Sequence, residues 1–249
     1  MQIQLIRSAT LRFTYAQKNF IIDPYFAPKH TRPSFTGASP NPLIDLPCSP
    51  LDVIAGIEMT LVSHLHSDHF DPVAQDLLPK DLSILCQIED KSTIESKGFY
   101  NVIPVISTVN WQGITITRTP CQHGTGEVLK EMGNASGFVF RSENEPTVYW
   151  AGDTIWCEAV ADVIRLTQPD IIITHSCGAT WGDRVLIVMD AAQTLAVHRA
   201  APNSIIIATH MDSLDHATVT RDDLRKYAEV NGLKPEKLLI PLDGESITF

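Results

Sequence analysis

The stretch Ser63-His64-Leu65-His66-Ser67-Asp68-His69 places three imidazoles and one carboxylate close together in the chain. Imidazole and carboxylate groups bind borderline metals such as zinc, and they also accept iron or manganese. Alternate side chains of an extended segment face the same way, so His64, His66 and Asp68 can share one side while His69 reaches a neighbouring site. This density of ligand-type residues indicates a metal site rather than a polar loop with incidental histidines.

The sequence around this stretch predicts a loop between a strand and a helix. The apolar run 59–62 precedes it and is typical of a strand. Asp71 and Pro72 follow as a helix N-cap and a first-turn proline. A loop of this kind exposes its backbone and lets a metal reach the side chains.

The composition is ordinary for a soluble globular protein, with 249 residues, 44% hydrophobic and 19% charged. No apolar run approaches the roughly 20 residues that a membrane span needs, and the N-terminus lacks the pattern of a signal peptide. The five cysteines are scattered and form no disulfide framework, which predicts a reducing, cytoplasmic location. The net charge of −10 disfavours a broad nucleic-acid surface. It does not exclude a small anionic substrate, because bound cations would reverse the local field.

Short strand-like runs alternate with helical ones along the chain. Strands are expected at 1–6, 20–23, 83–87, 102–106, 113–119, 137–141, 147–151, 170–174, 204–209 and 238–241, and helices at 90–97, 156–167, 188–200 and 221–231. A coarse duplication into halves of about 1–135 and 136–249 within one domain favours two sheets packed face to face. The proline-rich loop 28–50 is either functional or a surface excursion without a role.

Further metal ligands are expected where other strands end. His123 follows one such strand beside Gly124, which lets the backbone approach a ligand closely, and the less favoured alternative is a turn histidine. Asp153 ends an apolar strand and could bridge two cations while also capping a helix. His175 and His210 end two similar isoleucine-rich runs, and the residues alone do not rank them.

Five segments in order resemble the metallo-β-lactamase superfamily: Ile21-Ile22-Asp23-Pro24, His64-x-His66-x-Asp68-His69, Gln122-His123-Gly124, Ala151-Gly152-Asp153-Thr154 and Ala208-Thr209-His210. The chain resembles most the branch of small bacterial metal-dependent hydrolases that includes ascorbate-6-phosphate lactonase. The resemblance implies an α/β fold, a four-layer αβ/βα sandwich of two mixed sheets with helices outside. It would place the metals at one edge, between the sheets.

The resemblance also implies a ligand set. Seven side chains would hold two divalent metal ions, zinc above all, with manganese or iron as alternatives: His64, His66 and His123 on the first metal, Asp68, His69 and His210 on the second, and Asp153 between them. The order of the motifs in the superfamily favours His210 over His175 as a ligand. Asp23 would orient a ligand by hydrogen bonding.

These observations predict a hydrolase in which a dinuclear site lowers the pKa of bound water and supplies hydroxide at neutral pH. Asp68 would position that hydroxide, and a protonated His175 or His216 could assist the leaving group. The expected substrate is a small ester, lactone or phosphoester. Candidates for binding it are the basic residues Lys29, His30, Arg32 and Arg184, with Trp181 lining the pocket.

Two alternatives remain at this point. A phosphodiesterase or nuclease could use the same metals, although the chain shows no basic exosite for a nucleic acid. A non-catalytic metal-binding protein is the other, but it would normally have lost a ligand. Redox members of the superfamily typically carry Glu where this chain has His66, so hydrolysis is favoured over oxygen reduction. The resemblance also implies self-association.

Overall fold

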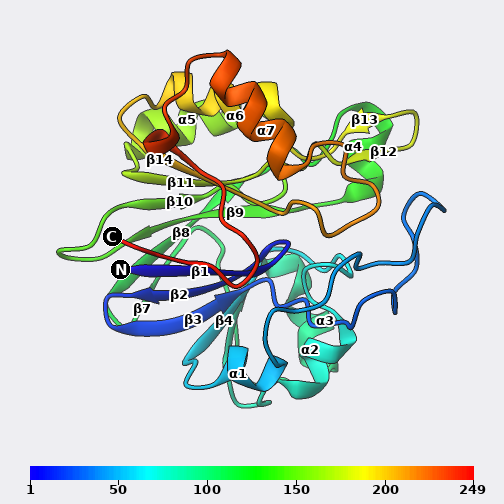
Figure 1. The fold of residues 1–249 in the computed structure, drawn as a ribbon. Helices are drawn as coiled ribbons and strands as arrows, with labels where there is room; N and C mark the ends of the chain where they lie inside the picture. The colour runs from blue at the N-terminus through cyan, green and yellow to red at the C-terminus, as the bar shows by residue number, and fades with distance from the viewer.

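The computed structural model describes the whole chain from Met1 to Phe249. Two seven-stranded sheets pack face to face, with helices on both outer faces (Figure 1). The first sheet runs in the order β16 (Ser246–Thr248), β1 (Gln2–Arg7), β2 (Thr10–Tyr15), β3 (Lys18–Ile22), β4 (Met59–Val62), β5 (Ser83–Cys86) and β6 (Val102–Pro104). The second runs β15 (Leu238–Leu239), β14 (Ile205–Thr209), β11 (Ile171–His175), β10 (Val148–Trp150), β9 (Ser136–Arg141), β8 (Ile114–Pro120) and β7 (Thr108–Trp111). The predicted four-layer sandwich is confirmed.

The helices divide between the two faces. The first sheet is covered by α1 (Pro50–Ile54), α2 (Pro72–Leu77) and α3 (Lys91–Ser96), with the 3-10 turn η1 (Ile88–Asp90) leading into α3. The second is covered by α5 (Glu158–Thr167), α6 (Ala191–Ala200) and α7 (Arg221–Val230), and η2 (Pro235–Lys237) precedes β15. At one end of the sandwich, α4 (Gly126–Met132) lies beside the hairpin of β12 (Thr180–Trp181) and β13 (Val185–Leu186). No helix is both long and apolar enough to cross a membrane.

Each sheet is half antiparallel and half parallel. β1, β2 and β3 pair antiparallel, and β3 to β6 continue in parallel. β7 to β10 are antiparallel, and β10, β11, β14 and β15 are parallel. The chain passes between the sheets after β6, earlier than the predicted boundary near residue 135, because the antiparallel hairpin of β7 and β8 already belongs to the second sheet. β16 then returns to the first sheet.

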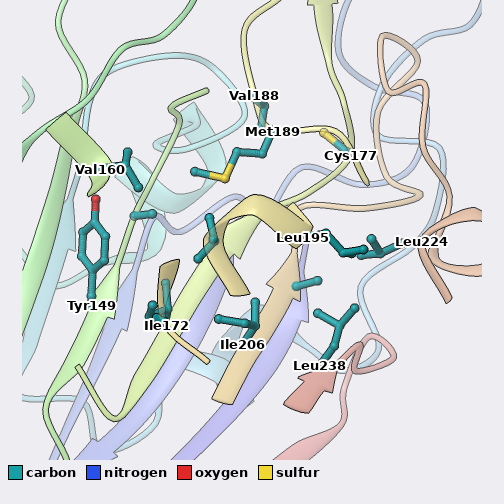
Figure 2. Packing of buried hydrophobic residues seen from close by; sticks show 14 of the residues in the cluster. Tyr149, Val160, Ile172, Cys177, Val188, Met189, Leu195, Ile206, Leu224 and Leu238 are labelled. Atoms are coloured by element: carbon teal, nitrogen blue, oxygen red, sulfur yellow. The ribbon is translucent and has the colours of Figure 1, made fainter. Parts of the chain in front are cut away.

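The isoleucine runs are buried on both faces. Ile171 and Ile173 belong to the core cluster between the sheets, whereas Ile172 packs beneath the helices of the second sheet (Figure 2). This alternation follows from the two-residue period of a strand and explains why a continuous apolar run suits a sheet covered on both sides. Because the central cluster contains residues of both sheets, we propose that the two halves form a single domain.

The loop that carries the opening motif is held by the helix after it. Asp71 caps α2 by accepting a hydrogen bond from the Ala74 amide at 3.0 Å, which confirms the predicted helix start. The same carboxylate accepts from the Phe26 amide at 2.9 Å, so it also fixes the chain just before the proline-rich loop.

Candidate metal centre

The predicted ligands all follow the carboxyl ends of strands at one edge of the sandwich. The segment from His64 to His69 follows β4, His123 follows β8, Asp153 follows β10 and His210 follows β14. Carboxyl ends of neighbouring parallel strands meet at one edge, which is the usual position of a site in α/β proteins. All of these ligand candidates are buried except His66, which is half-buried.

The side chains form four overlapping groups of three, in each of which the ligand atoms lie within 4.8 Å of one another: His64, His66 and His123; His64, His69 and Asp153; Asp68, His69 and His210; and Asp153, His175 and His210. The first and the third of these groups share no residue. Asp153 lies between them, with Oδ2 3.4 Å from His123 Nε2 and 3.1 Å from His69 Nε2. The arrangement has the form that two neighbouring cations sharing one carboxylate would require.

One carboxylate orients an imidazole in each group. Asp23 accepts hydrogen bonds from His69 Nδ1 at 2.7 Å and from the Ser63 hydroxyl at 2.7 Å. Because that hydroxyl donates to Asp23, its oxygen accepts from His64 Nδ1 at 2.9 Å. Both rings therefore direct Nδ1–H toward these acceptors and turn Nε2 toward the centre, as metal-binding histidines do.

The Nε2 atoms of His123 and His64 are suitable ligands for a cation. His123 donates from Nδ1 to the Ile187 carbonyl at 2.7 Å, and its Nε2 lies 3.4 Å from His66 Nδ1. His64 Nε2 is buried and has no hydrogen-bond partner. Buried nitrogens without partners are costly unless something positive binds them, and imidazole with carboxylate is a donor set that suits zinc, iron or manganese.

His175 and His210, which the residues alone did not rank as ligands, occupy different positions. His175 pairs with Thr209 in the parallel ladder, so His210 falls one residue beyond the strand, where its backbone turns to φ 63°. His210 Nε2 lies 3.4 Å from Asp68 Oδ2. His175 is fully buried and donates from Nδ1 to Asp153 Oδ1 at 2.5 Å. It therefore lies against Asp153 and does not line the cavity above the ligand cluster.

A cavity of about 250 Å³ opens above the ligand cluster. Its floor is made of His66, Asp68, His123 and Asp153, and its walls of Phe35, Ser67, Glu131, Met132, Trp181, Ile187 and His216. Trp181 and His216 were predicted from the sequence. Phe35, Met132 and Ile187 were not, and the only signal for Phe35 was an aromatic residue within a proline-rich loop.

The predicted basic residues are not part of this cavity. Lys29 and His30 are exposed, and Arg32 pairs with Asn41 in an isolated β-bridge within the loop. Arg184 lines a neighbouring outer hollow of about 890 Å³. The inner cavity thus contains no lysine or arginine.

The cavity groups differ in charge. Burial would raise the pKa of Asp68, but His69 and His210 outweigh burial and hold that pKa below its ordinary range. Burial lowers the pKa of His216 to about 4, so this imidazole is neutral at pH 7. The expected proton donor is therefore not charged in the structure.

Comparison with known proteins places this geometry in a family. Residues 18–211 match the Beta-lactamase superfamily domain. The chain belongs to the metallo-β-lactamase superfamily. It is 37% identical to the UPF0173 protein YddR of Bacillus subtilis, with all of both chains covered. Several further relatives are named UPF0173 metal-dependent hydrolases.

Two solved structures are similar to this superfamily member over its whole length. A possible metal-dependent hydrolase from Veillonella parvula is 35% identical with a TM-score of 0.96, and 99% of that chain is covered. The isothiocyanate hydrolase from Delia radicum gut bacteria is also 35% identical, with a TM-score of 0.93 and 99% of its chain covered. The protein is a metal-dependent hydrolase of this superfamily, with a buried His/Asp cluster able to bind metal.

Proposed function

We propose that this hydrolase uses two divalent cations to hydrolyse a small, neutral electrophile, either an isothiocyanate or a carboxylic ester or lactone. The observation that carries the proposal is the cavity wall. Phe35, Met132 and Trp181 offer apolar surface above the ligand cluster, and the wall contains no cationic side chain. A neutral group with an apolar substituent suits such a wall, because an anion there would lack a counter-charge apart from the metals.

The ligand assignment follows the two groups of side chains. His64, His66 and His123 would hold one cation, Asp68, His69 and His210 the other, and Asp153 both, with zinc as the expected metal. Cations bound here would lower the pKa of water and polarise the electrophile. The support is the orientation of His64 and His69, whose Nε2 atoms lie 3.8 and 3.1 Å from Asp153 Oδ2, together with the absence of a hydrogen-bond partner for His64 Nε2.

Two residues on the cavity would act on the reactants themselves. Asp68 is ionised and lies on the floor, where it can hold the attacking water as well as a cation. His216 is neutral, so we assign it the donation of a hydrogen bond to the substrate heteroatom rather than the transfer of a proton. His175 would support the site by holding Asp153 in place.

The similarity to an isothiocyanate hydrolase favours the first substrate class. Water oxygen would bond to the central carbon of R–N=C=S, the carbon–nitrogen bond would break, and both water protons would end on nitrogen. The products are the amine and carbonyl sulfide. The linear, neutral group can enter a small cavity, and its apolar substituent can rest against the aromatic wall.

Esters and lactones need the same chemistry at a carbonyl carbon and remain the second class. A phosphoester or a phosphorylated lactone, of the kind implied by the ascorbate-6-phosphate lactonase branch, is less favoured, since Glu131 adds a negative charge to the wall. The same reasoning disfavours a nuclease.

A cytoplasmic location, supported by five unpaired cysteines, and self-association remain predictions.

Turnover by protein loaded with zinc, manganese or iron would test the proposal. The substrates are benzyl isothiocyanate, phenyl acetate, γ-butyrolactone and bis(p-nitrophenyl) phosphate, with chelator-treated protein as the control. We expect benzylamine to be released fastest and only with metal. Preference for the phosphodiester would favour a phosphodiesterase. Metal-loaded protein without activity on any of the four would favour the non-catalytic alternative.

A further inference from the structure

Three aromatic side chains separate the metal cavity from the outer hollow. Phe35, Trp181 and His216 line both spaces, and we call them the aromatic collar. The Phe35 ring meets His216 edge-on at 4.7 Å between centroids and Trp181 at 6.4 Å. Such edge-to-face contacts are favourable and define ring orientation. The collar is therefore a fixed rim around the entrance rather than three independent side chains.

Each side of the collar is tied to a different segment. Trp181, on β12, donates from Nε1 to Glu131 of α4 at 3.0 Å. His216 follows Asp215 on the loop after β14. Phe35 belongs to the proline-rich loop, which has no helix or sheet of its own before α1 and depends on other segments for its position.

Asp215 supplies that position. Its carboxylate accepts hydrogen bonds from the Phe35 amide at 3.0 Å, from the Thr36 amide and hydroxyl at 3.2 and 2.6 Å, and from Asn41 Nδ2 at 2.8 Å. It also accepts from the Ser34 hydroxyl. The Asp215 amide in turn donates to Asn41 Oδ1 at 2.9 Å. A single carboxylate thus gathers both ends of the segment 34–41.

We propose that Asp215 is a positioning residue that holds Phe35 in the collar, and that the collar determines which substituents can accompany the reactive group. The inference rests on the proposed use of the cavity over the metals. With the collar closed, a substituent must fit within about 250 Å³. With Phe35 displaced, the cavity joins the outer hollow and a longer, rigid substituent can extend into it.

The loop is tested first, by hydrogen–deuterium exchange on the intact protein. Asp215→Asn keeps the shape of the side chain but removes charge and acceptor capacity. We expect amides of residues 34–41 to exchange at least about tenfold faster, because the hydrogen bonds that order them are weakened. Asp45→Asn, at an exposed position of the same proline-rich loop, is the matched control and should leave exchange unchanged. Wild-type exchange at 34–41 in the Asp215→Asn variant would overturn the positioning role.

Selectivity is tested by calorimetric titration of zinc-loaded protein with two metal-directed probes, benzohydroxamate and 4-phenylbenzohydroxamate. This readout needs no turnover, so it can fail or succeed independently of the proposed substrates. We expect wild type and Asp45→Asn to prefer the shorter probe. Phe35→Ala and Asp215→Asn should reduce that preference by about tenfold, a magnitude typical of pocket-size discrimination.

Phe35→Ala tests whether the collar selects by size, and Asp215→Asn tests whether Asp215 holds Phe35 in the collar. Unchanged preference in Phe35→Ala would overturn the collar as a selectivity element. Phe35→Leu, which keeps bulk but not an aromatic edge, should retain part of the preference. A loss as complete as that in Phe35→Ala would contradict selection by the bulk of this side chain.

Discussion

The floor and the wall of the cavity are built in different ways. The floor and the ligands beneath it consist of side chains that follow core strands. Several are held by buried hydrogen bonds, such as those from His69 to Asp23 and from His123 to the Ile187 carbonyl, both at 2.7 Å. The wall comes from a long loop, a short helix and a two-stranded hairpin, whose side chains are mostly half-buried. The difference teaches that the reaction type is determined by the scaffold, whereas the substrate is determined by segments that can change without disturbing it.

Removing the carboxylate shared by both groups should have the largest effect. We expect Asp153→Ala to lose at least one equivalent of metal and about a thousandfold or more in turnover, since the proposed assignment places both cations on this carboxylate. Elemental analysis and turnover would measure this, with His198→Ala on α6 as a control histidine outside the site. Full metal content and activity in Asp153→Ala would contradict the proposed bridging role.

A change in the wall should separate turnover from metal binding. His216→Ala removes the proposed hydrogen-bond donor, and we expect a loss of about a hundredfold in kcat with unchanged metal content, as for other donors to a developing charge. His216→Gln keeps an N–H group and should recover a large part of the activity. Equal losses in the two variants would show that packing against Phe35, rather than donation, explains the effect.

The third prediction concerns Asp23, which orients two ligand candidates through hydrogen bonds and is not itself a proposed ligand. Asp23→Asn should weaken metal binding by about ten- to a hundredfold, because Asp23 sets the proton position of both His64 and His69. Competition with a chromophoric chelator would measure the affinity. Asp45→Asn is a charge-matched control, and identical affinities in the two variants would rule out the orienting role.

The same contrast explains what could be predicted from the sequence. The ligand spacing between His64 and His69 is local, so the density of ligand-type residues indicated a metal site there. The predicted extended geometry is wrong in detail, because β4 ends at Val62 and a turn at 67–69 places Asp68 with His69 rather than with His64 and His66. Ranking His175 against His210 required the register of β11 and β14, which pairs His175 with Thr209 and depends on residues far apart in the chain. The position of Phe35 depends on Asp215, a contact across 180 residues that no local pattern reveals.

His175, which contacts the floor residue Asp153, offers a smaller test. His175→Asn can keep a donor near the position of Nδ1, whereas His175→Ala cannot, so we expect metal affinity to fall about tenfold in the alanine variant and less in the asparagine variant. Isothermal titration with zinc would compare them. A loss of kcat without any loss of affinity would instead support the leaving-group role first considered for this residue.

The smallest effect is expected from the basic residues of the proline-rich loop. Lys29 is exposed and Arg32 lies in the loop's own β-bridge, and neither lines the cavity. Lys29→Ala should therefore change kcat/KM for a neutral substrate by less than about twofold, at low and at high salt, as expected for a screened surface charge. A large, salt-sensitive loss confined to phosphorylated substrates would instead assign the outer surface to anion recognition. The wall would then select by charge as well as by size, and the preference for neutral substrates inferred from the cavity would no longer hold.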